Sequence, residues 1–225
     1  EENRRWMAYF KERGFHVLEI NARSGQGLRA IQPKVQEACR EKIERDKKRG
    51  IKNRPVRAIV VGIPNVGKST FINSFAGKAC AKTGNKPGVT KGKQWIRLNR
   101  ELELLDTPGI LWPRFESEEV GKKLAMIGSM NDDILQMTEL ASELLSWLLV
   151  HYREPLFARY QITGEEEVTP VEMLALICEN RRCYKKGQEP DYEKAAAILV
   201  DDFRSGRIGR ITLEMCGKGQ EEEQK

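Results

Sequence analysis

A run of eight residues from Gly62 to Ser69 carries the residue types that bind a nucleoside triphosphate. It reads G-I-P-N-V-G-K-S, the full G-x-x-x-x-G-K-S pattern of a phosphate loop. The apolar run 58–61 before it is typical of a buried strand, and residues 70–76 favour a helix that ends at Gly77. In this context, backbone N–H groups and the helix N-terminus surround the phosphates. The pattern therefore predicts a triphosphate site.

Two side chains of this loop have roles that follow from their chemistry. We expect Lys68 to reach the outer phosphates and the hydroxyl of Ser69 to ligate Mg²⁺. A lysine and a metal ion in these places neutralise the charge on the phosphate that is transferred. The loop residues expected to bind the nucleotide are Pro64, Asn65, Val66, Gly67, Lys68, Ser69 and Thr70.

A second motif, D-T-P-G at residues 106–109, follows the apolar run 102–105. A D-x-x-G at the end of a strand places a carboxylate beside the Mg²⁺ shell and offers its glycine N–H to the terminal phosphate. Between the two motifs, Thr90 lies in a Gly-rich loop, where its hydroxyl would bind Mg²⁺ only while the γ-phosphate holds the loop in place. The expected catalytic groups are Lys68, Thr90 and Gly109, the expected Mg²⁺ ligands are Ser69 and Thr90, and Asp106 and Gly109 complete the phosphate site.

A third loop, N-A-R-S-G-Q-G at residues 21–27, comes before the phosphate loop and follows an apolar run. It resembles the loop whose backbone contacts guanine in GTPases, which ordinary GTPases carry last, so the order resembles the circularly permuted GTPases. With G-I-P-N-V-G-K-S-T, A-K-T-G-N-K-P-G-V-T-K-G and L-L-D-T-P-G-I-L-W-P, it is similar to the YlqF/RbgA family of ribosome-assembly GTPases. The likeness covers nearly the whole chain, including D-F-R-S-G at 202–206. The residues expected at the base are Asn21, Ala22 and Arg23.

This resemblance implies an α/β fold, a circularly permuted P-loop GTPase domain followed by a C-terminal all-helical domain. It implies Mg²⁺-dependent hydrolysis of GTP to GDP as a switch in late assembly of the large ribosomal subunit. The implied partners are the large-subunit precursor, rRNA and ribosomal proteins, in the cytoplasm, and we expect a monomer. In such GTPases an Asn at the position of Asn65 accompanies a K⁺ ion that bridges the phosphates. We therefore expect slow hydrolysis that potassium and ribosomal particles stimulate.

Two features depart from the family pattern. The guanine-specific motif N-K-x-D does not occur, and in the permuted order it would precede the loop at 21–27 by about one strand–helix unit. The N-terminal G-H-M segment of the family is also missing, so we expect the 225 residues to be part of a longer chain. Ile110 stands where many GTPases have a Gln that orients water, and the resemblance implies that a histidine in the missing segment takes this role.

Two other functions stay open at this point. One is a nucleotide-gated ribosome- or RNA-binding module with negligible hydrolysis, which Ile110 suggests. The other is a P-loop ATPase or kinase, which is allowed because N-K-x-D is missing, although the loop at 21–27 and Thr90 favour a GTPase. Single-turnover hydrolysis separates the first from an enzyme, and competition between GTP and ATP separates the second.

The charge of the chain is unevenly distributed. The net charge is +6, but residues 1–115 carry +14 and residues 116–225 carry −8. The densest stretch, 40–57, has nine basic and three acidic residues, which indicates either a polyanionic partner or a solvated helix face. Five cysteines without a C-x-x-C pair are typical of reduced thiols in the cytosol. No apolar run approaches the ~20 residues of a membrane span, so no membrane partner is expected.

Helices and strands that would position these motifs alternate as far as residue 115. We expect helices at 3–13 and 28–48, strands at 16–20 and 58–61, and a hairpin of 95–98 with 102–106. Alternation of this kind predicts a largely parallel sheet.

After residue 115 the pattern favours helices. Asp132-Asp133 would cap one helix, a capping box at Thr169 would begin a second, and Asp191 would cap a third that ends at Gly206. The expected domains are 1–115, a GTPase domain, 116–215, a helical RNA- or ribosome-binding domain, and 216–225, a disordered tail. The basic residues of the helical domain expected to meet RNA phosphates are Arg181, Arg182, Lys185, Lys186, Arg204, Arg207 and Arg210.

Overall fold

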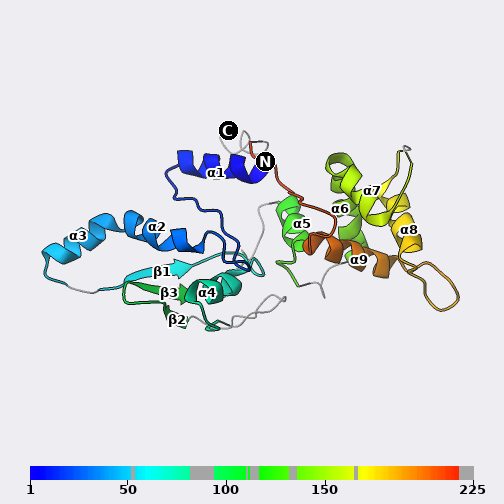
Figure 1. Ribbon diagram of the computed structural model, residues 1–225. Coiled ribbons are helices and arrows are strands. Elements are labelled where there is room, and N and C mark those ends of the chain that lie inside the picture. The colour runs from blue at the N-terminus through cyan, green and yellow to red at the C-terminus, as the bar shows by residue number, and fades with distance from the viewer. Residues whose placement is uncertain are drawn as a thin grey trace. The chain divides into compact units, whose positions relative to one another are not determined.

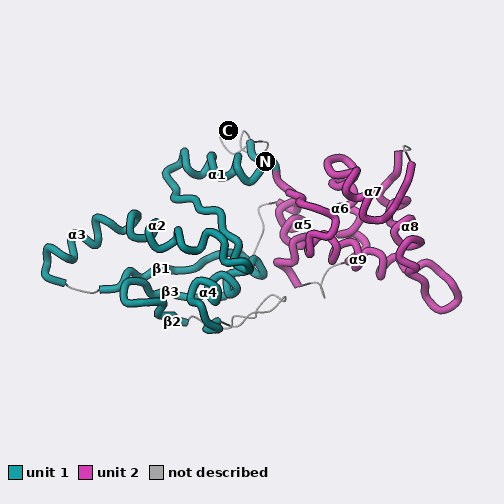
Figure 2. The backbone as a smooth tube through the Cα atoms, viewed as in Figure 1, with its two compact units in different colours: residues 1–111, 215–225 teal, residues 112–214 magenta. Residues whose placement is uncertain are grey.

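The chain divides into two compact units in the computed structural model. Unit 1 comprises residues 1–111 with 215–225, and unit 2 comprises residues 112–214 (Figure 2). The structure describes residues 1–51, 54–81, 94–109, 111, 117–131, 136–164 and 167–217. Among the residues singled out above, Thr90, Ile110, Asp132 and Asp133 lie outside the described residues.

Unit 1 is built on a three-stranded sheet in the order β1-β3-β2 (Figure 1). Strand β1 (Val56–Val60) runs parallel to β3 (Leu102–Asp106), and β2 (Gln94–Arg97) runs antiparallel to β3. The predicted hairpin is therefore confirmed. The described sheet has one parallel and one antiparallel pair, because the connection between β2 and β3 is too short for a parallel crossover.

One face of this sheet is covered by the helix that follows the phosphate loop. In α4 (Lys68–Ala76), Ile72 is fully buried against Leu102 and Leu104 of β3, every second residue of which points inward. The helix ends at Gly77, which has a left-handed backbone with φ 64° as the sequence predicted. This packing holds the first turn of α4 beside the ends of β1 and β3.

The N-terminal part of unit 1 is helical but less continuous than expected. The predicted helix at 3–13 is α1 (Glu2–Glu12). The predicted helix at 28–48 consists of a short 3₁₀ turn η1 (Leu28–Ala30), α2 (Ile31–Ala38) and α3 (Arg40–Lys48). The break lies at Cys39, whose φ of −101° and ψ of 10° leave the helical region. The side chain of Cys39 still packs against the sheet core, as do Val35 of α2 and Ile43 of α3.

The strand expected at 16–20 is wrong, because residues 15–20 are irregular. Alternating apolar residues form a strand only where a neighbouring strand takes up their backbone hydrogen bonds. The segment pairs with none of the three described strands. The first β-type backbone pairing after this segment is the isolated antiparallel bridge between Asn21 and Gln26.

The described part of unit 2 is all-helical, with α6 packed against the other four helices around a buried apolar core. The helices are α5 (Glu118–Met126), α6 (Met137–His151), α7 (Arg153–Tyr160), α8 (Pro170–Asn180) and α9 (Tyr192–Arg204). Leu144 and Leu148 of α6, Met173 of α8 and Leu199 of α9 have no exposed surface. No helix of the described residues is long and apolar enough to cross a membrane.

Two of the three predicted helix starts in unit 2 are confirmed. Thr169 and Glu172 form a reciprocal capping box before α8, and the Asp191 side chain accepts the Lys194 N–H at the start of α9. Helix α6 is capped at Gln136, so the cap expected at 132–133 is not its N-cap. Helices α5 and α7 have no counterpart among the predicted elements. Helix α5 was missed although it begins at a serine N-cap, Ser117, whose side chain accepts the Val120 N–H, whereas α7 is short and has no side-chain cap.

Candidate nucleotide site

The phosphate loop bends back on itself through two left-handed residues. Asn65 has φ 59° and Gly67 has φ 88°, and Gly67 is the N-cap of α4. A residue with a Cβ is strained at such a φ, which explains the glycine immediately before the helix. Pro64 is buried, while Asn65 and Val66 are exposed on the outer turn. The loop thus delivers the chain to the helix N-terminus at Lys68, as a phosphate cradle requires.

Lys68 lies across its own loop. Its ammonium donates hydrogen bonds to the carbonyl oxygens of Gly62, at 2.9 Å, and Ile63, at 2.7 Å. Partial burial lowers the pKa of Lys68, and the negative charge of Asp106 opposes that shift. The cation is therefore held at the mouth of the loop by two carbonyls and has a third N–H to offer.

Asp106 ends β3 at the edge of the sheet where the phosphate loop begins. It pairs in register with Val60, the last residue of β1, and the next residue ties the two strand ends together, since the Thr107 hydroxyl donates to the Val60 carbonyl at 2.7 Å. The carboxyl ends of parallel strands are where ligands bind in sheets of this kind. The strand register therefore places Asp106 beside the entry to the loop.

The carboxylate of Asp106 is buried and incompletely satisfied. The residue is 2% exposed, and its Oδ1 has no hydrogen-bond partner among the described atoms. Burial raises the pKa of Asp106, against the charge of Lys68 and a backbone hydrogen bond at Thr107, which act to lower it. A buried, unpaired carboxylate oxygen is costly unless a ligand completes its shell.

Gly109 touches the phosphate loop with its backbone. A Cβ at this position would lie 2.6 Å from the Cα of Pro64 and 2.9 Å from the Nζ of Lys68. No side chain fits there without movement of the loop, so only glycine lets the D-T-P-G segment approach it. The contact brings the Gly109 backbone next to the lysine that is expected to reach the outer phosphates.

This donor set fits a Mg²⁺ ion that takes part of its shell from phosphate. The described residues hold no group of three His, Cys, Asp or Glu side chains that would bind a metal alone. They do provide a buried carboxylate oxygen on Asp106 and a hydroxyl on Ser69, the second residue of α4. Mg²⁺ is commonly held by few protein oxygens together with substrate phosphates and water. Thr90, the other expected ligand, lies outside the described residues.

The loop at 21–27 is closed by its own first side chain. The Asn21 Oδ1 accepts the backbone N–H of Arg23, at 3.0 Å, and of Ser24, at 3.1 Å. The Asn21 N–H in turn donates to the Gln26 carbonyl at 2.9 Å. The amide of Asn21 therefore shapes the loop, and the exposed edge of the loop is left to Arg23 and the backbone. Ala22 is half-buried within it.

Helix α2, which follows this loop, is tied to the β2–β3 hairpin by a carboxylate. Gln32 and Gln36 both donate to the Oε2 of Glu101, at 2.9 and 2.7 Å. Gln32 also accepts from Asn99 in the hairpin turn at 3.2 Å. These hydrogen bonds attach the element after the loop at 21–27 to the strand that carries Asp106. No sequence pattern had marked the two glutamines.

The basic residues expected to meet RNA in unit 2 fall into two groups. Arg204 donates to the carbonyls of Met126, at 2.9 Å, and Ala125, at 2.7 Å, at the end of α5, and Arg207 pairs with Asp201 and Asp202. Arg181 lies 3.8 Å from Asp202 as well. These three arginines are engaged inside the unit, which corrects their expected role as free phosphate ligands. Arg182, Lys185, Lys186 and Arg210 are exposed, and Arg207 is exposed as well despite its ion pairs.

Asp202 is the centre of an internal network that the sequence did not reveal. It is 2% exposed and accepts two hydrogen bonds from Arg159, at 2.8 and 3.0 Å, and one from the Tyr160 hydroxyl at 3.1 Å. Burial acts to raise the pKa of Asp202, but Arg159, Tyr160 and the charge of Arg207 outweigh it, so the pKa lies below its ordinary value. Burial also raises the pKa of the Tyr160 phenol, assisted by the negative charge of Asp202.

Comparison with known proteins matches residues 57–168 to a family described as 50S ribosome-binding GTPase. The chain is 44% identical to ribosome biogenesis GTPase A of Bacillus cereus over 94% of the chain and 71% of that relative. It is 45% identical to the protein of the same name from Priestia megaterium, over 93% of the chain and 73% of the relative. The structure resembles that of GNP-bound YlqF from T. maritima, with a TM-score of 0.62 and 26% identity over 95% of this chain and 75% of that one.

Proposed function

The chain belongs to the ribosome biogenesis GTPase A family, known as YlqF or RbgA, and from that premise we propose that it hydrolyses GTP as a switch in late assembly of the large ribosomal subunit. As a member of this family it is a P-loop GTPase of ribosome biogenesis. To this family assignment the proposal adds that the protein acts late in assembly, on the large subunit and in the cytoplasm. It also adds direct contact with rRNA and ribosomal proteins.

The observation that carries the catalytic part is the convergence of Lys68, Asp106 and Gly109 on one loop. Gly109 approaches Pro64 and the Lys68 ammonium too closely for any side chain, and Asp106 ends the neighbouring strand. Transfer of a γ-phosphoryl group needs positioning and charge neutralisation more than covalent chemistry. Lys68 would contact the outer phosphates, and the Gly109 N–H would sense the γ-phosphate.

Mg²⁺ would be held by Ser69 and Thr90, with Asp106 beside its shell. The metal would supply neutralisation of the phosphate charge that develops during transfer. The buried Oδ1 of Asp106, unpaired among the described atoms, would be available to accept a hydrogen bond from a water bound to the ion. The backbone N–H groups from Pro64 to Thr70 and the loop from Asn21 to Arg23 would bind the phosphates and the base.

Potassium is a proposed second ion at Asn65. Asn65 has a left-handed backbone and is exposed on the outer turn of the loop, which forms the rim of the proposed cradle. A cation at this rim would add positive charge where the chain has Ile110, a side chain unable to orient water. We expect faster hydrolysis in K⁺ than in Na⁺ at equal ionic strength, and equal rates would remove potassium from the proposal.

Single-turnover hydrolysis of GTP, with and without purified ribosomal particles, tests the proposed function. We expect slow turnover alone and acceleration by large-subunit precursors but not by small subunits. Equal effects of the two particles would contradict the large-subunit assignment. Tight GTP-dependent binding to the precursor without hydrolysis would instead favour the nucleotide-gated binding module.

The choice of base is tested by competition. Unlabelled GTP should displace a fluorescent GTP analogue, and ATP should not displace it at comparable concentration. Equal displacement by ATP would contradict guanine specificity and favour the alternative of a P-loop ATPase or kinase.

A further inference from the structure

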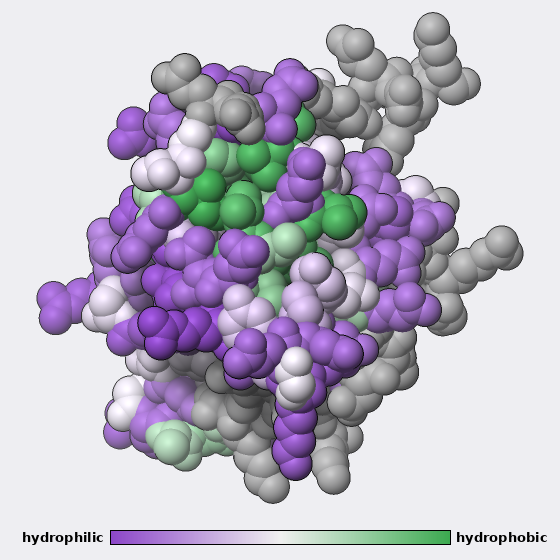
Figure 3. All heavy atoms as spheres, turned by 90° about the vertical axis from the view of Figure 1, so that its right-hand side faces the viewer, coloured by the Kyte–Doolittle hydropathy of each residue, from purple (hydrophilic) through white to green (hydrophobic). Residues whose placement is uncertain are grey.

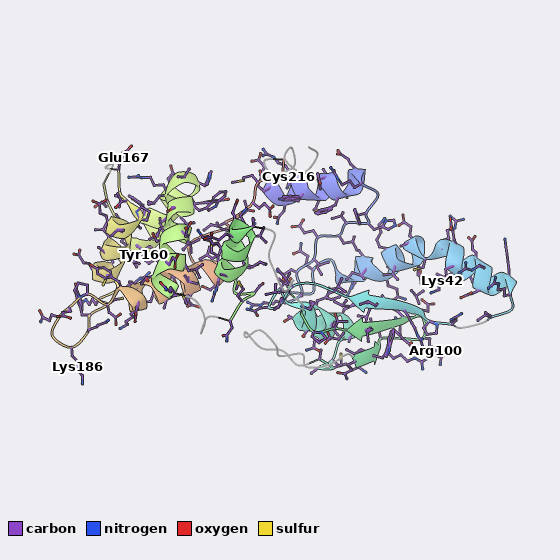
Figure 4. All side chains as sticks on the ribbon, turned by 180° about the vertical axis from the view of Figure 1, so that it is seen from behind. Lys42, Arg100, Tyr160, Glu167, Lys186 and Cys216 are labelled. Atoms are coloured by element: carbon purple, nitrogen blue, oxygen red, sulfur yellow. The ribbon has the colours of Figure 1, made fainter. Side chains whose placement is uncertain are left out.

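The loop that joins α8 to α9 carries an isolated basic segment on an acidic part of the chain. Residues 182–190 contain three basic residues and one acidic residue, Glu189, whereas residues 116–225 together carry a net charge of −8. We call residues 182–190 the α8–α9 loop. Figure 4 shows Lys186 at the far end of this loop, projecting away from the helices. A local excess of positive charge on a negative background marks where a polyanion would bind.

The cations of this loop are available, unlike those of the Asp202 network. Arg182, Lys185 and Lys186 are exposed, and none of their side chains makes an ion pair or hydrogen bond among the described residues. Arg181, one residue earlier, is instead held against the Tyr160 ring, with its Cζ 5.2 Å from the ring centroid. The internal network thus anchors the base of the loop, and the free charges begin directly after it.

The backbone of the loop is fixed in shape. The Lys185 N–H donates to the Glu189 carbonyl at 2.8 Å, and the Asp191 N–H donates to the Cys183 carbonyl at 2.8 Å. A bridge between Tyr184 and Pro190 lies between these two bonds. The buried Cys183 closes the base, since its carbonyl also accepts from the Cys178 thiol at 2.9 Å. A preformed loop loses little conformational freedom when it binds, which favours affinity.

Two exposed aromatic rings accompany the charges. Tyr184 in the loop is 45% exposed and Tyr192, at the start of α9, is 44% exposed. Exposed tyrosines among basic side chains provide faces on which unpaired bases stack while the cations neutralise phosphates. Polar side chains cover most of the face that Figure 3 turns to the viewer, around a smaller apolar area.

We propose that the α8–α9 loop binds unpaired RNA, with a base stacked on Tyr184 and neighbouring phosphates on Arg182, Lys185 and Lys186. The inference rests on the proposed direct contact with rRNA and names residues of unit 2 that would make it. Unpaired nucleotides fit better than a duplex, because a stacking ring needs a base that is not enclosed in a helix. An acidic protein segment would use the charges but would not need the ring.

Fluorescence anisotropy with a short labelled single-stranded RNA tests the charges. Lys185→Gln/Lys186→Gln should weaken binding about tenfold and lower the slope of log affinity against log salt by about one per lysine. Lys122→Gln/Lys123→Gln is the matched control in the same unit. It removes the same charge, but both lysines already pair with glutamates of α5 and α6, so binding should change less than about twofold.

The ring is tested with Tyr184→Leu and Tyr184→Phe. Leucine should weaken binding of single-stranded RNA about tenfold, and phenylalanine should preserve it, because stacking needs the ring and not the hydroxyl. Unchanged affinity and salt slope in the double lysine variant would overturn the site. Equal losses for Tyr184→Leu and Tyr184→Phe would overturn the stacking contact. Loss of binding to ribosomal particles with unchanged RNA affinity would assign the loop to a protein partner and also overturn it.

GTP hydrolysis by the same variants without particles distinguishes this proposal from the proposed function. All of them should hydrolyse GTP at the parental rate, since none of the substituted residues belongs to the nucleotide site. If RNA binding is unchanged while particle-stimulated hydrolysis persists, the loop assignment fails and the GTPase switch stands. If no ribosomal particle accelerates GTP hydrolysis by the parental protein, the proposed switch function fails, independently of the RNA affinity of the loop.

Discussion

Asp106 and Asp202 are buried to the same extent, and their surroundings are opposite. Each is 2% exposed, one in each unit. Asp202 accepts hydrogen bonds from Arg159 and Tyr160 and lies in ion pairs with Arg181 and Arg207, whereas Asp106 has an oxygen with no partner among the described atoms. Accordingly the pKa of Asp202 lies below its ordinary value and that of Asp106 above it.

The difference distinguishes a carboxylate that stabilises the fold from one that has an oxygen available to a ligand. A buried charge surrounded by donors is satisfied by the fold alone, and removing it leaves several groups unpaired. A buried charge with an open position costs stability until a ligand arrives, which is typical of functional sites. By this criterion we expect the nucleotide to bind at Asp106 in unit 1, whereas the Asp202 network supports the helices of unit 2.

The largest effect is expected from Lys68→Ala. The substitution removes the cation held at the mouth of the phosphate loop and should lower the rate of GTP hydrolysis by about 1,000-fold. Lys78→Ala, an exposed lysine just after α4, is the control and should leave the rate unchanged. Single-turnover kinetics measures both. Near-parental hydrolysis by Lys68→Ala would remove the phosphate loop from the mechanism.

The next effect is on stability, from Asp202→Asn. The amide cannot replace the charge between the arginines, so unit 2 should lose about 3 kcal/mol of unfolding free energy, measured by chemical denaturation. Because its folded pKa is lowered, Asp202 stabilises the unit above its unfolded pKa of about 3.9, and this contribution is lost as pH falls through the folded pKa. The variant should therefore differ most from the parent near neutral pH and least in acid. A constant difference at all pH values would contradict the assignment.

Gly109→Ala should act on hydrolysis somewhat less strongly than Lys68→Ala. The new Cβ would collide with Pro64 of the phosphate loop, and the displacement should lower the hydrolysis rate about 100-fold. GDP binding should be preserved, because GDP lacks the phosphate that Gly109 is proposed to sense. Equilibrium binding of the two nucleotides measures the difference. Equal losses of GTP and GDP affinity would point to collapse of the loop instead.

The smallest effect is expected from Thr169→Ala, which removes half of the capping box before α8. Loss of an N-cap side chain should destabilise unit 2 by about 1 kcal/mol without changing GTP hydrolysis. Thermal unfolding and the hydrolysis assay together measure this. A change in hydrolysis of the size expected for Gly109→Ala would mean that α8 takes part in the nucleotide site.

The sequence predicted best those features that depend on local patterns. The G-x-x-x-x-G-K-S run fixed both the loop and the start of α4, and the capping box at Thr169 lies as expected. It predicted poorly what depends on distant partners. The expected strand at 16–20 does not form because no described strand pairs with it. A local pattern carries no information on whether a neighbour is available.

The site shows the same division. Lys68, Asp106 and Gly109 are predicted site residues from their motifs, and in the structure Asp106 lies at a strand end and Gly109 lies against the loop. The Asp202 network was missed because Arg159 lies far from Asp202 in the sequence and no motif joins them. For the same reason Arg204 and Arg207 were expected at an RNA surface, although buried partners already engage them.

Calorimetry of Asp106→Asn and Asp202→Asn without nucleotide, near neutral pH, tests the contrast between the two carboxylates most directly. A raised folded pKa means that ionised Asp106 costs stability as pH rises through its folded pKa, so its neutral amide should leave the unfolding temperature of unit 1 unchanged or higher. Asp202→Asn should lower that of unit 2 by about 10 °C or more. A comparable loss for Asp106→Asn would show that Asp106 is satisfied by the fold, and would contradict its role as a site held open for a ligand.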